Sequence, residues 1–127
     1  MYLKINTISS ENVIEIFDEN FAVTAKYEKT MARNESEIML SWIDEIVGKK
    51  LHSTRGIIVC VGPGSYTGVR VGVTIANSMA LSLNIPIIGY KIGDVPDYSL
   101  LQQNTFVAPV LPYYDREPLI TKPKARL

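Results

Sequence analysis

The stretch that decides the fold is Gly56-Ile57-Ile58-Val59-Cys60-Val61-Gly62-Pro63-Gly64-Ser65-Tyr66-Thr67-Gly68-Val69-Arg70. Its first part, residues 56–61, is an unbroken apolar run, which predicts a strand buried on both faces in the middle of a parallel sheet. Residues 67–84 predict one long helix. The glycine-rich loop between them combines two glycines, which adopt backbone shapes that other residues resist, with the stiffening Pro63. We expect Thr67 to be the N-cap of the helix, so that the stretch forms a strand, a rigid turn and a helix.

Small residues recur at every fourth position of this helix, at Gly68, Gly72, Ala76 and Ala80. The spacing places them on one face, where no side chain extends beyond a methyl group and another helix can approach closely. The remaining faces are rich in valine, isoleucine, methionine and leucine. A helix that is apolar nearly all round must be covered on more than one side. We therefore expect part of this cover to come from another protein.

Composition indicates one ordinary domain, because the 127 residues are 46% hydrophobic and long enough to bury a core. Thirteen basic residues balance thirteen acidic ones, so the zero net charge argues against bulk electrostatic binding of nucleic acid. The single cysteine, Cys60, excludes an internal disulfide and is expected to be an inert core residue. No apolar stretch of about 18 residues and no signal-peptide layout is present, so we expect a cytoplasmic protein without a membrane contact.

The remaining chain adds strands and one helix around this unit. Alternation and turn residues predict an antiparallel meander of three strands over residues 3–7, 12–17 and 21–27. A first helix is predicted over 35–47, capped by Asn34 with Glu37 three residues on, and ended by Gly48. Residues 87–90 predict a last strand after the stop at Asn84. The resulting order, β-β-β-α-β-α-β, is similar to a ribonuclease-H-like, actin-type lobe.

Beyond residue 90 the pattern is weaker. Residues 94–103 predict a short helix, and 106–110 an edge strand. The end of the chain is rich in proline and charge, which predicts an extended tail that docks on the domain surface. We therefore expect two parts, a lobe over residues 1–111 and a tail over 112–127.

The glycine-rich loop admits a chemical interpretation beside the structural one. Loop amides next to a helix N-terminus favour anions, so residues 62–68 could cradle a phosphate. The loop is neither a Walker A sequence nor Gly-x-Gly-x-x-Gly, because the third glycine comes one place late. The alternative is a turn that only sets the angle of the helix against the sheet.

Candidates for catalysis lack their partners. Ser65 and Thr67 could be nucleophiles, but the only histidine, His52, falls in a polar loop and supplies no evident base. One histidine and one cysteine give no metal-ligand cluster. Asn6 ends the first strand as an amide and so lacks the charge that attracts a metal ion. The positive charge of Arg70 in the first turn of the helix opposes the helix dipole. Its role could be a structural ion pair or a contact with a partner.

The run Val61-Gly62-Pro63-Gly64-Ser65-Tyr66-Thr67-Gly68-Val69-Arg70-Val71-Gly72 resembles the signature of the TsaB (YeaZ) family. Ala76, Ala80, Leu81 and the run Asn84 to Gly89 continue the resemblance, which covers about residues 3–93. Residues 112–118 are similar to the tyrosine- and arginine-containing end of that family. Two positions depart from it, because Asn6 stands where Asp is common and Glu35 where relatives often have His.

The resemblance implies an α/β fold with a single ribonuclease-H-like, actin-like (ASKHA) lobe. It implies a non-catalytic scaffold subunit, without cofactor or metal, of the complex that makes N6-threonylcarbamoyladenosine at position 37 of tRNA. The implied partners are TsaD, bound through the first-lobe helices, and the ATPase TsaE, with tRNA bound only indirectly. The chain is similar to a minimal, one-lobe version. The expected partner-binding residues are Glu37, Gly68, Arg70, Gly72, Ala76 and Ala80.

Two other hypotheses remain. A nucleotide-binding enzyme or a peptidase-like hydrolase of the same fold would need the bases and metal ligands that the sequence lacks. A self-associating chain without a TsaD contact would form a homodimer, with twofold symmetry, through the same two helices.

Overall fold

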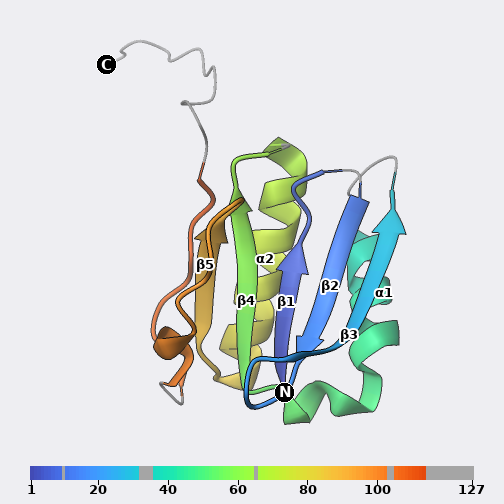
Figure 1. The fold of residues 1–127 in the computed structure, drawn as a ribbon. Helices are drawn as coiled ribbons and strands as arrows, with labels where there is room; N and C mark the ends of the chain where they lie inside the picture. The colour runs from blue at the N-terminus through green and yellow to red at the C-terminus, as the bar shows by residue number, and fades with distance from the viewer. Residues whose placement is uncertain (10, 32–35, 65, 103–104, 114–127) are drawn as a thin grey trace.

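The structure is a computed structural model that describes residues 1–9, 11–31, 36–64, 66–102 and 105–113. Its elements are β1 (Tyr2–Asn6), β2 (Glu11–Phe17), β3 (Val23–Thr30), α1 (Ser36–Val47), the 3-10 helix η1 (Gly48–Ser53), β4 (Gly56–Gly62), α2 (Tyr66–Leu83), β5 (Ile87–Lys91) and the 3-10 helix η2 (Tyr98–Gln102) (Figure 1). The predicted order of strands and long helices is confirmed. No helix in these described ranges is long and apolar enough to cross a membrane.

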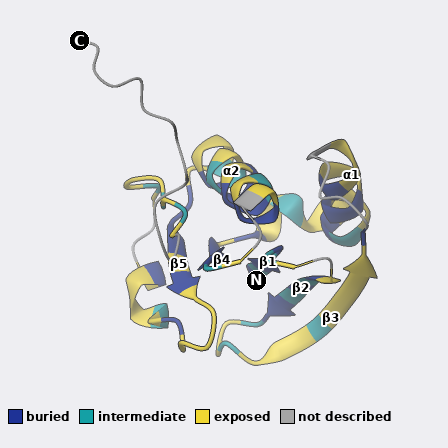
Figure 2. Cartoon of the chain, turned by 90° about the horizontal axis from the view of Figure 1, so that it is seen from above, coloured by how far each residue is buried: buried dark blue, intermediate teal, exposed yellow. Residues whose placement is uncertain are grey.

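The five strands form one mixed sheet in the order β3-β2-β1-β4-β5. The β1–β2 and β2–β3 pairs are antiparallel, whereas β4 pairs in parallel with β1 on one side and with β5 on the other. All seven residues of β4 are buried, as its unbroken apolar run predicts. Both long helices cover the same face of the sheet (Figure 2). The glycine-rich loop therefore leaves β4 at its carboxyl end and turns the chain back over that face.

The third strand is shifted from its predicted position. It begins at Val23 and extends to Thr30, so the prediction of a strand over 21–27 is wrong at both ends. Phe21 lies in the preceding turn with a φ of 62°, a left-handed conformation that a strand does not use. Its N–H donates to the carbonyl of Asp18 at 3.0 Å, and the Asp18 N–H donates to the carbonyl of Ala22 at 2.9 Å. These bonds close the turn and delay the strand.

The end of α2 follows the predicted stop. Asn84 takes a left-handed φ of 53°, and its N–H donates to the carbonyl of Leu81 at 3.2 Å. The N–H of Ile85 donates to the carbonyl of Ala80 at 3.0 Å. This pair of bonds is a Schellman motif, with asparagine at the position that glycine usually takes. The start of α2 differs from the prediction: the helix begins at Tyr66, so Thr67 lies inside its first turn and is not the N-cap.

Residues 105–113, here called the strap, run beside β5 without forming the edge strand predicted over 106–110 (Figure 1). The side chain of Asn77 on α2 makes the two backbone hydrogen bonds that a neighbouring strand would otherwise make. Its amide nitrogen donates to the carbonyl of Val110 at 2.9 Å, and its Oδ1 accepts from the Val110 N–H at 2.9 Å. The Phe106 N–H donates to Asn84 Oδ1 at 3.2 Å. Part of the cover that α2 requires therefore comes from the chain itself.

Other predictions for the ends of elements fall partly outside the described residues. The described part of the predicted helix over 94–103, residues 94–102, contains the 3-10 helix η2 and no α-helix. The predicted cap at Asn34, the start at Glu35 and the tail beyond residue 113 lie outside the described ranges. The division into a lobe and a tail therefore stays a prediction.

Removal of the Asn77 amide tests the strap. We expect Asn77→Ala to lower the free energy of unfolding by about 1–3 kcal/mol, because both backbone groups of Val110 lose their partners in a part-buried place. Urea unfolding measures the change. Thr74→Ala, at an exposed position one turn earlier on the same helix, is the matched control. Equal midpoints for the two variants would show that the bonds from Asn77 to the strap contribute no stability.

The face of the sheet away from the helices carries a smaller core with a buried polar pair. Cys60 and Tyr90 both lie in this core, which also contains Ile58, Ile88 and Leu101. Burial raises the pKa of the Tyr90 hydroxyl well above its usual range, and it also raises the pKa of the Cys60 thiol. Cys60 is therefore a protonated core residue, and its predicted inertness has a physical cause.

This pair makes the fold sensitive to alkali. At a pH above their ordinary pKa values the two groups lose their protons in the unfolded chain and keep them in the native one. The unfolded state then binds fewer protons, so the free energy of unfolding falls as pH rises above about 9, by up to about 1.4 kcal/mol per pH unit for each group. We expect Tyr90→Phe to flatten this fall in urea unfolding between about pH 9 and 11. Tyr27→Phe, on the exposed strand β3, should leave it unchanged; equal slopes would contradict the assignment.

Candidate interaction surface

The row of small residues on α2 faces the sheet. Ala76 and Ala80 are completely buried in the main core. A Cβ atom added to Gly72 would overlap the hydroxyl of Thr7, the residue that follows β1. The same Thr7 hydroxyl donates to the carbonyl of Gly68 at 2.6 Å. The row therefore lets α2 approach the end of β1 closely.

The prediction that this row contacts a partner is wrong for its four members. Gly68, Gly72, Ala76 and Ala80 are all buried inside the chain. The physical reason is that a small face allows close packing on any neighbour, and the neighbour here is the chain's own sheet. Glu37 on α1 and Arg70 on α2 are exposed, and their partner contacts stay a prediction.

The glycines of the loop have packing roles. Gly62 has a φ of 108°, and a Cβ atom there would lie 2.7 Å from the carbonyl oxygen of Tyr113 on the strap. A Cβ atom on Gly64 would lie 2.6 Å from the Cβ of Ile8. Both positions therefore exclude larger residues because another part of the chain passes close by. The structural interpretation of the loop accounts for both glycines without a phosphate.

Within the part of the chain that the structure describes, the candidate catalytic side chains are not brought together with a base or a metal site. The Oδ1 of Asn6 accepts a hydrogen bond from the Ile8 N–H at 3.2 Å, which supports a structural role. His52 is exposed in η1, and Thr67 is exposed in the first turn of α2. Ser65 and the side chain of Tyr66 lie outside what the structure describes. Among the described residues, no group of three or more histidine, cysteine or acidic side chains is placed to hold a metal ion.

An apolar groove lies between the two long helices. We call it the helix groove; its volume is about 190 Å³, and it is lined by Leu40, Leu51, Ile75, Ser78, Met79, Ser82 and Leu83. Leu40 on α1 is 49% exposed, which leaves a large apolar side chain at the edge of the groove in contact with water. Ser78 and Ser82 on α2 are both exposed. The groove thus combines apolar walls with two small side chains, four residues apart, over which another helix can pass closely.

Sequence reasoning missed the groove residues, although two signals were available. Leu40 falls outside the apolar stripe of α1 and so has no place in that helix's own core. Ser78 and Ser82 repeat the four-residue spacing of the small row on a different face of α2. Spacing alone does not say which of two small faces of a helix is buried. The glycine and alanine row lies among more apolar residues, and the prediction therefore chose that row as the partner surface.

Comparison with known proteins places the chain. The family model described as TsaD, tRNA N6-adenosine threonylcarbamoyltransferase, matches residues 23–115. The protein of Escherichia coli K12 named tRNA threonylcarbamoyladenosine biosynthesis protein TsaB is 30% identical over 90 residues, or 68% of this chain and 38% of that protein. The TsaB of Haemophilus influenzae is 39% identical over 59 residues, or 44% and 25%. This chain belongs to the TsaB (YeaZ) family.

Another TsaB, from Bacillus subtilis 168, is 68% identical over 31 residues, or 24% of this chain and 14% of that protein. The chain therefore spans less than half of the length of these curated TsaB relatives. Two solved structures from Pseudomonas aeruginosa share the fold with a TM-score of 0.62 at 19% identity, over 72% of this chain and 44% of theirs. One is described as YeaZ and the other as an uncharacterized protein with similarity to the peptidase YeaZ. The predicted fold class, a single ribonuclease-H-like, actin-like sheet with its helices, is confirmed.

Proposed function

We propose that this TsaB-family chain is a non-catalytic subunit in the synthesis of N6-threonylcarbamoyladenosine in tRNA, and that it binds the transferase TsaD through α1 and α2. The observation that carries the proposal is the helix groove, an open apolar surface on a chain whose relatives are named for this pathway. Exposed apolar surface of this kind is typical of a site for another protein.

The family relationship indicates what kind of surface the partner presents. The TsaD family model matches residues 23–115, a range that includes both α1 and α2. A TsaD chain therefore has counterparts of these two helices. Two similar helix pairs can pack on each other about an approximate twofold axis, as two copies of one chain do. A homodimer built on the helix groove would use the same contacts, and TsaD would replace one copy.

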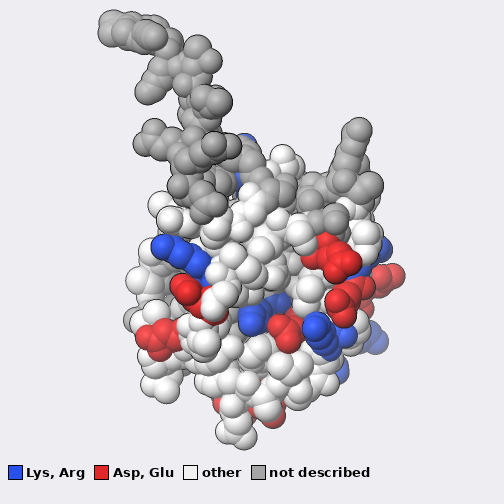
Figure 3. All heavy atoms as spheres, turned by 45° about the horizontal axis from the view of Figure 1, so that its top comes forward, with Lys and Arg blue, Asp and Glu red and all other residues white. Residues whose placement is uncertain are grey.

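The described residues support a role without chemistry of its own. The loop glycines are explained by packing on Tyr113 and Ile8, and the Asn6 amide is bonded to the backbone. Basic and acidic side chains are interspersed on the face that Figure 3 shows, so a continuous basic surface for tRNA is not seen there. We therefore propose that tRNA is bound by the partners, with TsaE joining the assembly, and that the protein acts in the cytoplasm without a cofactor.

Reconstitution tests this role. We expect purified chain alone to form no threonylcarbamoyladenosine and to hydrolyse no ATP, whereas its addition to TsaD, TsaE, tRNA and a threonylcarbamoyl donor should raise product formation. Product is measured by mass spectrometry of digested tRNA. Turnover by the chain alone that disappears in Ser65→Ala or Asn6→Ala would favour the enzyme alternative. A TsaD reaction unchanged by the chain would contradict the proposed role.

A further inference from the structure

A second apolar surface lies at the opposite edge of the molecule from α1, along β5 and the strap. Six of the eleven large hydrophobic side chains exposed in the described residues fall within residues 92–113. Val107 and Leu111 on the strap are 68% and 77% exposed, and Leu100 on η2 is 51% exposed. A groove of about 220 Å³ lies between Leu100, Val107 and the sheet, lined by Pro86, Ile87, Ile88, Leu100, Val107 and Ala108. We call this surface the strap face.

The strap face results from how the strap is held. Asn77 and Asn84 bind the backbone of Val110 and Phe106, and the Tyr113 N–H donates to the carbonyl of Val61 at 2.8 Å. Backbone bonding fixes which strap side chains turn inward. Phe106 and Val110 pack on the main core, which leaves Val107 and Leu111 facing water. A single exposed leucine requires no explanation, but an apolar groove beside several does.

We propose that residues 114–127 of this chain return along the strap and cover the strap face, with Leu119 and Ile120 packed against Val107 and its groove. Residues 114–127 lie outside the described residues, and they contain this one apolar pair before the terminal Leu127. Three features of the chain select this segment over another occupant: its reach, its composition and its charge.

The reach matches the position of the groove. Tyr113 is bonded at the carboxyl end of β4, whereas Val107 lines the groove with the first residues of β5. The strap itself covers that distance between residues 107 and 113. A return path of the same six residues brings the chain to Leu119, and six extended residues span about 20 Å. The length of this segment therefore places Leu119 and Ile120 beside Val107 when the segment is extended.

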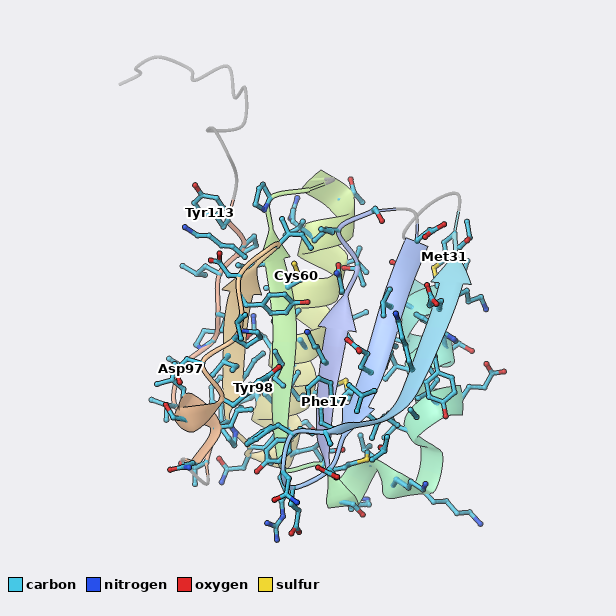
Figure 4. The ribbon with its side chains drawn as sticks, viewed as in Figure 1. Phe17, Met31, Cys60, Asp97, Tyr98 and Tyr113 are labelled. Atoms are coloured by element: carbon cyan, nitrogen blue, oxygen red, sulfur yellow. The ribbon has the colours of Figure 1, made fainter. Side chains whose placement is uncertain are left out.

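Charge also favours this occupant. Residues 114–127 contain four basic and two acidic side chains, so the rest of this neutral chain carries a net charge of −2. Asp94 and Asp97, both exposed, lie in the segment that joins β5 to η2. Figure 4 shows Asp97 and Tyr113 on the same side of the sheet, the side of β5. The carbonyl of Asp97 accepts from the Leu100 N–H at the start of η2, beside the groove, whereas Asp94 bonds to Lys91 at the carboxyl end of β5. Lys122, Lys124 and Arg126 would follow the apolar pair toward Asp97, an arrangement of opposite charges that sets register.

Thiol labelling of the full-length chain tests the proposal. Cys60 is completely buried, so a cysteine introduced at Val107, or at Leu111 as a second reporter, is the reactive thiol. We expect Val107→Cys to react with a disulfide reagent about tenfold faster when Leu119→Asp is added, because that change removes the apolar contact of one leucine. Thr121→Asp adds the same charge two positions on and is the matched control. Unfolding midpoints confirm that each variant is folded.

Three results would overturn the proposal. Fast labelling in every variant would show that the strap face is open. Slow labelling whose rate is the same with Leu119→Asp, but rises when the protein is diluted, would show that a second copy covers the face. Slow labelling that neither Leu119→Asp nor dilution alters would show that residues 114–127 have no part in the cover.

Discussion

Replacement of Ala76 by tryptophan is expected to lower the free energy of unfolding by about 3 kcal/mol, the upper end of the usual cost of overpacking a core. Ala76 is completely buried, in a row that allows α2 to lie close to β1 and β4. An indole at this position would have to push the helix away from the sheet. The same movement would break the bond between the Thr7 hydroxyl and the carbonyl of Gly68, which measures 2.6 Å.

Urea unfolding followed by circular dichroism measures this effect. Thr74→Trp introduces the same side chain two residues earlier, at an exposed position of α2, and should change the free energy of unfolding by no more than about 0.5 kcal/mol. A midpoint for Ala76→Trp equal to that of Thr74→Trp would mean that the small row does not face the sheet. The close packing described for Gly72 and Thr7 would then be wrong as well.

Replacement of Ser78 by tryptophan is expected to weaken TsaD binding by about 100-fold or more, while the chain remains folded. Ser78 is exposed in the helix groove, where its small side chain leaves room for a partner helix. An indole there would fill the space that the partner helix needs. Since the position faces water in the free chain, the stability of the chain itself should change little.

Fluorescence anisotropy with labelled TsaD measures the affinity. Lys26→Trp, on the exposed strand β3, is the control for a surface tryptophan remote from the groove. Unchanged affinity for Ser78→Trp would remove the groove from the interface. A loss of affinity in both variants would show that the assay reports a general effect of a surface indole.

Local patterns in the sequence predicted most of the fold. The unbroken apolar run of β4 predicted an interior strand buried on both faces, and β4 lies between β1 and β5 with all seven residues buried. The stop at Asn84 was predictable because asparagine takes the left-handed conformation that a helix end requires. The left-handed turn at Phe21 was not, since an aromatic residue seldom adopts that conformation, and the third strand was therefore placed two residues early.

The candidate site was less predictable because its geometry depends on contacts far apart in the chain. The Asn77 side chain meets Val110 across 33 positions, so no local pattern distinguishes it from an asparagine in water. The spacing of the small row states which residues share a face of α2 and leaves open which neighbour covers that face. Because the small row is buried against the sheet, the candidate interface lies instead at Leu40, Ser78 and Ser82.

Hydrogen exchange of the full-length chain with and without TsaD tests the proposed interface most directly. We predict that TsaD slows exchange in peptides from α1, residues 36–47, and from α2, residues 66–83, and leaves β3 and the strap unchanged. Slower exchange confined to β3 or to the strap, or no change at a saturating TsaD concentration, would contradict the claim that this chain binds TsaD through the helix groove.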